Sequence, residues 1–192
     1  MFIEKRLPPE NRVGKCEGDE EHHLPEIAVM LACADWLMAQ GATKISVHPD
    51  GMHLKTDFVW HWTKARGFQK IRQLGRTQAG GEYISNGRHL TILPKPGLGD
   101  VISELDGVQI EIEAKGGCIN SRHAGQLSKL RQSIQTAIGQ LMCSRSTADR
   151  LIAAVPDHSE TRVWAQRILP RCKKVGIEIL LVSSDGSIIE FR

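Results

Sequence analysis

The sequence predicts an α/β fold in which helices flank a mixed β-sheet. One observation is a hairpin signal, because Asp106-Gly107 lies between two runs of β-branched and apolar residues. A second is the strand–helix–strand pattern over 151–182, which requires a parallel pair with a right-handed crossover. A chain of 192 residues also suffices to bury the core of one domain. We expect an irregular leader over 1–23 and one domain over 24–192.

The elements before the hairpin follow from periodicity and turn signals. Pro25 suits the first turn of an amphipathic helix that ends near Gln40-Gly41. After this helix we expect, in order, a strand over Thr43–His48, a turn at Pro49-Asp50-Gly51, a strand over Met52–Trp60, a short helix within 64–78, and strands over Tyr83–Ser85 and Leu90–Leu93 around Asn86-Gly87.

The elements after the hairpin alternate between helix and strand. Leu127, Leu130, Ile134 and Leu141 have the spacing of a long helix. The segments that follow are a buried strand over Leu151–Val155, a helix from about Ser159 that Pro170 kinks or shortens, a buried strand over Ile177–Val182, and a last strand over Ile188–Phe191.

The hairpin gathers charged side chains of a kind that binds metal ions. Since strand side chains alternate with period two, Glu111, Glu113 and Lys115 share one face of the second arm. Asp100 lies at the far end of the first arm and is expected to face Glu113 across the hairpin. Two carboxylates beside one ammonium group suit a hard divalent cation and the chemistry of phosphodiester hydrolysis.

Asp100, twelve further residues and then Glu113-Ala114-Lys115 resemble the motif of the PD-(D/E)XK nucleases, the restriction-endonuclease-like superfamily. The expected order of elements over 24–192 is also similar to that fold. Gly99 stands where the motif has proline. The resemblance implies that Asp100, Glu113 and the backbone carbonyl of Ala114 bind Mg²⁺ or Mn²⁺, and that Lys115 contacts the attacking water or the scissile phosphate.

Four further residues are considered for the same site. In several branches of the superfamily an acid on the first helix completes the site, which makes Glu26 a candidate, although the helix macrodipole alone also explains an acid at that position. Gln126 and Lys129 lie on one side of the long helix, where superfamily members often place a glutamine or a basic residue facing the metal. Glu111 is either a third acid for a second metal or a surface carboxylate.

Positive charge is clustered, although the net charge is only +3. No acid occurs over 58–81 or over 114–148. We expect nucleic-acid contacts from the basic residues of these segments, with two solvated basic faces as the alternative. The candidates are Lys64, Arg66, Lys70, Arg72, Arg76, Arg122 and Lys129. Trp60 and Trp62 are expected to share a strand face, either stacking on bases or, more simply, packing in the core.

The sequence argues against several other classes of protein. No apolar run reaches the length of a membrane span, and the first residues lack the apolar segment of a secretory signal, so we expect a cytoplasmic protein without membrane contact. Five widely spaced cysteines without a Cys-x-x-Cys pair argue against a disulfide framework or a zinc knuckle. The histidines also lack zinc-ligand spacing.

These observations predict a Mg²⁺-dependent deoxyribonuclease, most simply an endonuclease, with Mn²⁺ as a substitute ion. DNA is the expected partner, and by analogy the chain acts as a homodimer or within a larger nucleoprotein complex. Two alternatives remain open: a non-catalytic nucleic-acid-binding subunit, and a nuclease directed at RNA.

Overall fold

The computed structural model describes residues 2–50, 56–93, 95 and 99–191. Its helices are α1 (Glu26–Ala39), α2 (Thr56–Ala65), α3 (Ala124–Cys143) and α4 (Ser159–Lys174), with a 3₁₀ turn η1 (Glu10–Arg12). Its strands are β1 (Glu4–Arg6), β2 (Glu21–Leu24), β3 (Lys44–Val47), β4 (Gln69–Gln73), β5 (Gly81–Ser85), β6 (Arg88–Ile92), β7 (Val101–Leu105), β8 (Val108–Ala114), β9 (Gly117–Cys118), β10 (Arg150–Pro156), β11 (Ile177–Val182) and β12 (Ile188–Phe191).

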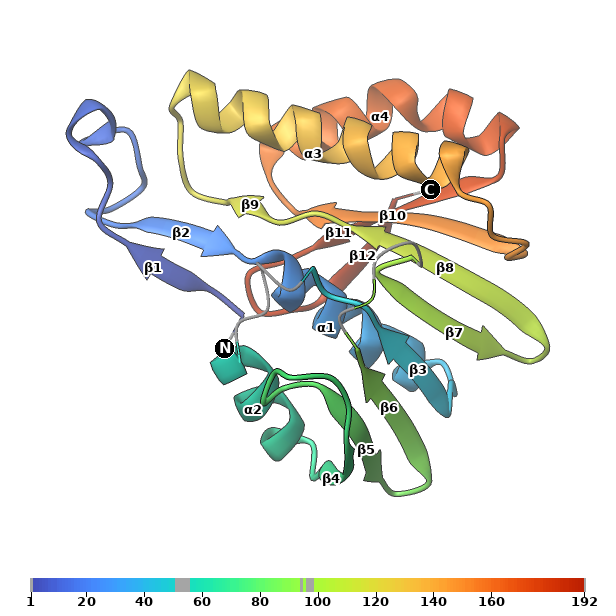
Figure 1. Ribbon diagram of the computed structural model, residues 1–192. Helices are drawn as coiled ribbons and strands as arrows, with labels where there is room; N and C mark the ends of the chain where they lie inside the picture. Colours follow the sequence, from blue (N-terminus) through green and yellow to red (C-terminus); the bar gives the residue numbers. More distant parts are fainter. Residues whose placement is uncertain (1, 51–55, 94, 96–98, 192) are drawn as a thin grey trace.

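The described strands form two sheets (Figure 1). The larger is mixed and has the order β12-β11-β10-β8-β7-β3-β6-β5-β4. The smaller, β1-β2-β9, extends from one end of the molecule as a ribbon, seen at the left of Figure 1. The predicted mixed sheet with flanking helices is therefore confirmed.

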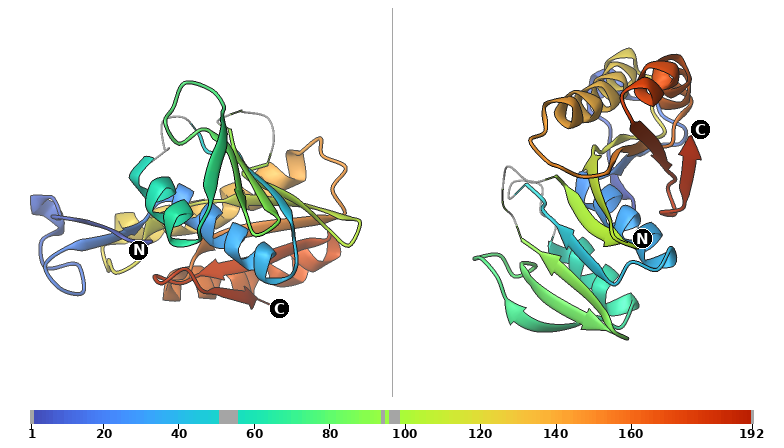
Figure 2. Two further views of the ribbon diagram at one scale, coloured as in Figure 1. Left: turned by 90° about the horizontal axis from the view of Figure 1, so that it is seen from below. Right: turned by 90° about the vertical axis from the view of Figure 1, so that its right-hand side faces the viewer.

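Helices cover both faces of the larger sheet (Figure 2). Helices α3 and α4 pack on one face against β10 and β11, and α1 packs on the other against β3, β7, β8 and β10. Strand β10 shows why this arrangement is stable, because Ile152 and Ala154 join the apolar cluster around α1 whereas Ala153 and Val155 join the cluster beneath α3 and α4. A strand buried on both faces has the continuous apolar sequence seen here.

The predicted hairpin and parallel unit are both confirmed. Asp106 and Gly107 have φ angles of 52° and 81°, the left-handed conformation that a two-residue hairpin turn requires. Strand β7 pairs antiparallel with β8, with Val101 opposite Ile112, so Asp100 reaches the level of Glu113. Strands β10 and β11 are parallel and are joined through α4.

Helix α1 differs from the amphipathic helix that the sequence predicts. Ten of its residues are buried, because α2 covers it in addition to the sheet, whose edge strand β12 also contacts it. Of the two effects predicted for Pro170, shortening does not occur, since α4 runs through Pro170 to Lys174. None of the helices in the described ranges combines the length and the apolar composition that a membrane crossing needs.

The strand predicted over Thr43–His48 is confirmed as β3, whereas the segment between β3 and β5 was predicted wrongly. Of the strand expected over Met52–Trp60, residues 52–55 lie outside the described residues and the remainder belongs to α2. Trp60 and Trp62 therefore point in different directions, with exposed fractions of 64% and 5%. The helix expected within 64–78 is replaced by β4, an edge strand whose residues are all exposed and so lack an apolar signal.

The N-terminal segment is ordered, whereas the sequence predicted an irregular leader. Strand β2 pairs with β1 on one side and with β9 on the other. The Asn120 side chain fixes the base of this ribbon, because its amide nitrogen donates to the carbonyls of Glu17 and Glu20 and its oxygen accepts from the His22 amide. These contacts join residues far apart in the sequence, so local patterns do not reveal them.

One backbone segment connects the two sheets. Strand β8 leaves the large sheet at Ala114, and two residues later the chain enters the ribbon as β9. A Cβ atom on the intervening Gly116 would lie 2.5 Å from the carbonyl oxygen of Leu24 and 2.6 Å from the amide nitrogen of Glu26. Only glycine permits this close approach of backbone to the start of α1.

We expect Gly116→Ala to lower the free energy of unfolding by about 1–3 kcal/mol, because the added methyl group meets backbone and not a flexible side chain. Gly139→Ala is the matched control, since Gly139 is exposed within α3 with open space around it, and should raise stability by about 0.5–1 kcal/mol. Urea denaturation monitored by circular dichroism measures both changes. Equal stability of Gly116→Ala and the wild type would contradict the close approach.

Candidate active site

The candidate site lies where β8 ends, beside the start of α1. Asp100 immediately precedes β7, Glu113 and Ala114 end β8, and Lys115 follows them. The backbone amide of Lys115 donates to the carbonyl of Ala154 at 2.9 Å, which holds Lys115 against β10. Glu26 is the first residue of α1. The site is thus built on regular elements, which fix the positions of its side chains.

The Lys115 ammonium group lies at the centre of the site. Its Nζ atom is 3.2 Å from Asp100 Oδ2, 3.6 Å from Glu113 Oε2 and 3.9 Å from Glu26 Oε2. It also donates to the carbonyl oxygen of Ala114 at 2.9 Å. Asp100 is held in turn by the backbone amide of Ala114, which donates to its Oδ2 atom at 2.8 Å. The structure therefore brings together Asp100, Glu113, Lys115 and Glu26.

The charges in this cluster do not balance, since three carboxylates surround one ammonium group. The pKa of Glu113 is raised to about 8, first by burial and then by the negative charge of Asp100, while Lys115 acts in the opposite direction. Burial lowers the pKa of Lys115, but the charges of Asp100, Glu26 and Glu113 outweigh burial, and the net shift is upward. The site therefore attracts additional positive charge.

The donor set suits a hard divalent cation. The carboxylates of Asp100 and Glu113 and the Ala114 carbonyl all lie within 3.6 Å of one ammonium group, so their oxygens already converge on a cation. Mg²⁺ and Ca²⁺ prefer carboxylate and carbonyl oxygens as ligands. The excess of acid over base leaves negative charge for such an ion to neutralise.

Gly99 and Glu111 occupy adjoining space at the edge of the site. A Cβ atom on Gly99 would lie 2.5 Å from Cγ of Glu111, so a proline at position 99 would collide with that side chain. Glu111 is buried, and its carboxylate accepts a hydrogen bond of 2.8 Å from Ser144 Oγ, just after α3. The departure from the nuclease motif at position 99 thus has a steric reason. Glu111 is a buried, hydrogen-bonded acid and not a surface carboxylate.

A groove of about 520 Å³ opens beside Lys115, between the ribbon and α3. Gln126 and Lys129 line it together with Lys115, as their place on α3 predicts. Gln126 is buried, whereas Lys129 is exposed. Arg122 lies elsewhere, because it pairs with Glu17 at 3.1 Å and lines a different cavity.

The basic residues of the segment 64–76 belong to a separate surface around α2 and β4. Several of them are engaged there: Arg66 binds Asp35 and stacks on Trp62, Arg72 pairs with Glu82, and Lys70 donates to Gln73. None of Lys64, Arg66, Lys70, Arg72 and Arg76 is among the described residues that line the groove beside Lys115.

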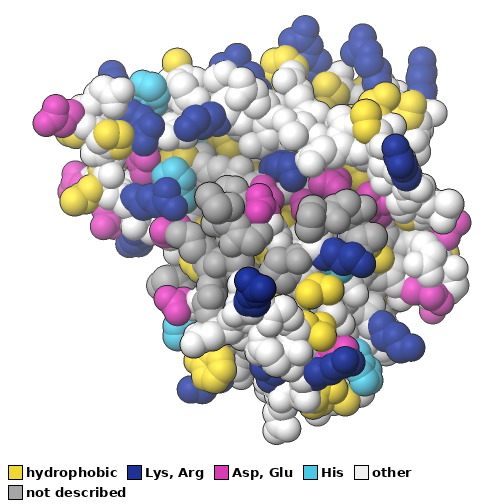
Figure 3. Space-filling view, in the orientation of Figure 1, with side chains coloured by type: hydrophobic (Ala, Val, Ile, Leu, Met, Phe, Trp, Pro, Cys, Tyr) yellow, Lys and Arg dark blue, Asp and Glu magenta, His cyan; other side chains and the backbone are white. Residues whose placement is uncertain are grey.

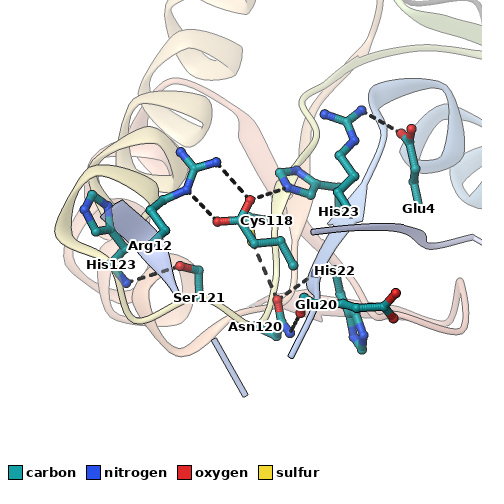
Figure 4. Close-up of polar contacts among 11 residues, drawn as sticks. Glu4, Arg12, Glu20, His22, His23, Cys118, Asn120, Ser121 and His123 are labelled. Carbon is teal, nitrogen blue, oxygen red and sulfur yellow. Dashed lines mark hydrogen bonds and ion pairs between the residues drawn. The ribbon is translucent and has the colours of Figure 1, made fainter. Parts of the chain in front are cut away.

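Sequence reasoning missed a second polar cluster, on the ribbon. Glu21 is 1% exposed, and its carboxylate binds Arg12 Nε at 2.7 Å and His23 Nε2 at 3.1 Å, with Arg12 and His23 pointing toward one another in Figure 4. Burial raises the pKa of Glu21, but His23 and Arg12 lower it by more. Glu21 and His23 alternate as residues on one face of a strand do, which is the one local signal of their proximity.

Glu21, His23 and Cys118 also place one potential ligand atom each within 4.8 Å of one another. However, both oxygens of Glu21 already interact with cationic side chains, since Arg12 forms bonds of 2.7 and 3.0 Å to them. We therefore interpret this cluster as an ion pair that joins η1 to β2.

The raised pKa of Glu113 predicts a pH-dependent loss of stability in metal-free protein. The folded protein retains a proton up to about pH 8 that the unfolded chain releases near 4.5, so stability decreases as pH rises between these values. Glu113→Gln removes this effect. In EDTA, the melting temperature of Glu113→Gln minus that of the wild type should therefore increase between about pH 5.5 and about pH 8.5.

Glu104→Gln is the matched control, because it makes the same change at an exposed position of β7. Its melting-temperature difference from the wild type should stay nearly constant over the same pH range. A pH-independent difference for Glu113→Gln would contradict the raised pKa.

Comparisons of the chain with models of protein families, with curated proteins and with solved structures give no match. The chemistry of the candidate site therefore has to be inferred from its geometry and from the motif that Asp100, Glu113 and Lys115 form.

Proposed function

We propose that this chain is a Mg²⁺-dependent deoxyribonuclease with a restriction-endonuclease-like fold. The observation that carries the proposal is the convergence of Asp100, Glu113 and the Ala114 carbonyl on the Lys115 ammonium group. A structural ion pair has no need of three carboxylates around one lysine. A site that binds both a divalent cation and a phosphodiester needs such an excess of oxygen ligands beside a cationic donor.

The topology supports the same proposal. The acid-bearing hairpin β7–β8 lies inside the sheet, α1 precedes it in sequence, and α3-β10-α4-β11 follow it. This order is similar to the core of the restriction-endonuclease-like fold. The site lies at the carboxyl ends of the parallel strands β8 and β10, which is where open α/β sheets commonly bind their ligands.

Each side chain of the site has a separate role in the proposed reaction. Asp100, Glu113 and the Ala114 carbonyl would hold the ion, and Mn²⁺ is a suitable substitute because it accepts the same oxygen ligands. When bound, the ion supplies Lewis-acid stabilisation of the charge that develops on the phosphoryl oxygens. Lys115 donates hydrogen bonds to the scissile phosphate or to the attacking water. Glu26 positions Lys115, and Gln126 donates or accepts a hydrogen bond beside it.

Cleavage of supercoiled, linear double-stranded and single-stranded DNA tests this proposal. With Mg²⁺ or Mn²⁺ we expect cleavage that EDTA abolishes. Glu113→Gln and Lys115→Ala should each reduce the rate at least ~100-fold, the usual effect of removing one electrostatic contact to the transition state. Glu26→Gln should reduce it by less, because Glu26 acts through Lys115.

The matched controls remove the same charges outside the site: Glu104→Gln for Glu113→Gln, and Lys174→Ala for Lys115→Ala. Both should cut like the wild type. Equal cleavage by wild type, Glu113→Gln and Lys115→Ala would reveal a contaminating nuclease and overturn the assignment. Salt-sensitive DNA binding without cleavage under any metal would identify a binding subunit instead, and cleavage of RNA alone would correct the substrate.

A further inference from the structure

The groove beside Lys115 is lined by several further basic side chains, which the proposed role of Lys115 does not itself require. The ribbon contributes Arg6, Arg12 and His23 to its lining, and α3 contributes Lys129. Among the described residues that line it, Glu21 is the single acid, and that carboxylate pairs with Arg12. Arg6 pairs with Glu4, which lies outside the lining, at 2.7 Å. The lining therefore contains more basic than acidic side chains, with Arg6 on the ribbon side and Lys129 on the α3 side.

The groove and the catalytic cluster are continuous, because Lys115 belongs to both. Gly116, Gly117 and Cys118 form its floor and lead from Lys115 into the ribbon. In Figure 3 basic and acidic side chains are mixed over the ribbon at the left, whereas basic side chains predominate over the helices at the top of the molecule. Acidic side chains gather across the middle of the same face.

Two side chains in the groove are positioned for a ligand. Gln126 is 5% exposed and lines the groove. A side-chain amide at the wall of a groove offers both a hydrogen-bond donor and an acceptor to a ligand. Lys129 is exposed one turn further along α3, and no carboxylate of the described residues pairs with it.

The ribbon wall of the groove contains a buried ion pair. Arg12 binds Glu21 through two contacts, of 2.7 and 3.0 Å, and Glu21 is almost fully buried. This pairing joins η1 to β2, and the ribbon contacts α3 through β9. Removing Arg12 would leave a buried carboxylate without its main partner, which is strongly destabilising.

From these observations we infer that the groove between the β1–β2 ribbon and α3 holds the sugar-phosphate backbone of the DNA next to the cleaved bond. The inference rests on the proposed function and names the surface that binds its substrate. In this arrangement Arg6 and Lys129 contact phosphates from opposite sides, and Gln126 hydrogen-bonds the backbone between them and Lys115. The basic residues of the segment 64–76, which the sequence also singled out, are not needed for these contacts.

The salt dependence of DNA binding tests whether the groove contacts the DNA backbone. Binding of a fluorescein-labelled DNA duplex is measured by anisotropy at several salt concentrations, with Ca²⁺ replacing Mg²⁺. Each lost phosphate contact should reduce the slope of log affinity against log salt by about 0.9. We therefore expect Arg6→Ala and Lys129→Ala each to lower the slope by about one, and the double variant by about two. Gln126→Leu should weaken binding without changing the slope.

The control is Arg171→Ala with Lys174→Ala, which removes two exposed charges from the end of α4 far from the ribbon (Figure 1). It should leave the slope unchanged. If the slopes of Arg6→Ala and Lys129→Ala equal the wild-type slope, the groove does not bind the DNA backbone as inferred. Cleavage by the wild type in Mg²⁺ is measured separately. If the wild type cleaves DNA but the slopes of the variants are unchanged, only the assignment of the groove as the DNA-binding surface is wrong. If the slopes are lowered but no cleavage occurs, the proposed nuclease activity is wrong and the groove remains a DNA-binding surface.

Discussion

The interaction on which the rest of the site depends is the contact of Lys115 with the carboxylates of Asp100, Glu113 and Glu26. Like charges that lie close together repel when they are partly buried, so a positive charge among them stabilises the fold. The single ammonium group neutralises the three carboxylates incompletely, and burial together with the charge of Asp100 raises the pKa of Glu113. A divalent cation would complete the neutralisation, which links the stability of this corner of the fold to the proposed chemistry.

Two glycines make that arrangement possible from the backbone side. Gly116 lets the chain pass within contact of the first residues of α1, which brings Glu26 close to Lys115. Gly99 leaves room for the buried side chain of Glu111, at the position where the nuclease motif has proline. The backbone that follows Gly116 continues into the ribbon, so the same segment that ends in the site also forms the floor of the groove.

Strong local signals predicted much of this structure. The Asp106-Gly107 turn and the apolar strands β10 and β11 were identified because turn chemistry and two-sided burial act within a few residues. Strand β4 was missed because all its side chains are exposed. Part of α2 was predicted as a strand because the turn signal at Pro49-Asp50-Gly51 suggested a chain that returns in a hairpin. The ribbon was missed because it is fixed by contacts such as that of Asn120 with Glu17. For the same reason the sequence did not reveal that, of the seven basic residues it singled out, Lys129 alone lines the groove beside Lys115.

The most direct test of the account is a crystal structure of the protein with Mn²⁺, with data collected to locate the ion by its anomalous scattering. The account predicts one or two anomalous peaks bound by Asp100, Glu113 and the Ala114 carbonyl, with the Lys115 ammonium group moved aside but still close to Asp100. A peak on Glu21 and His23 alone, or no peak near Glu113 at a Mn²⁺ concentration that supports activity, would contradict it.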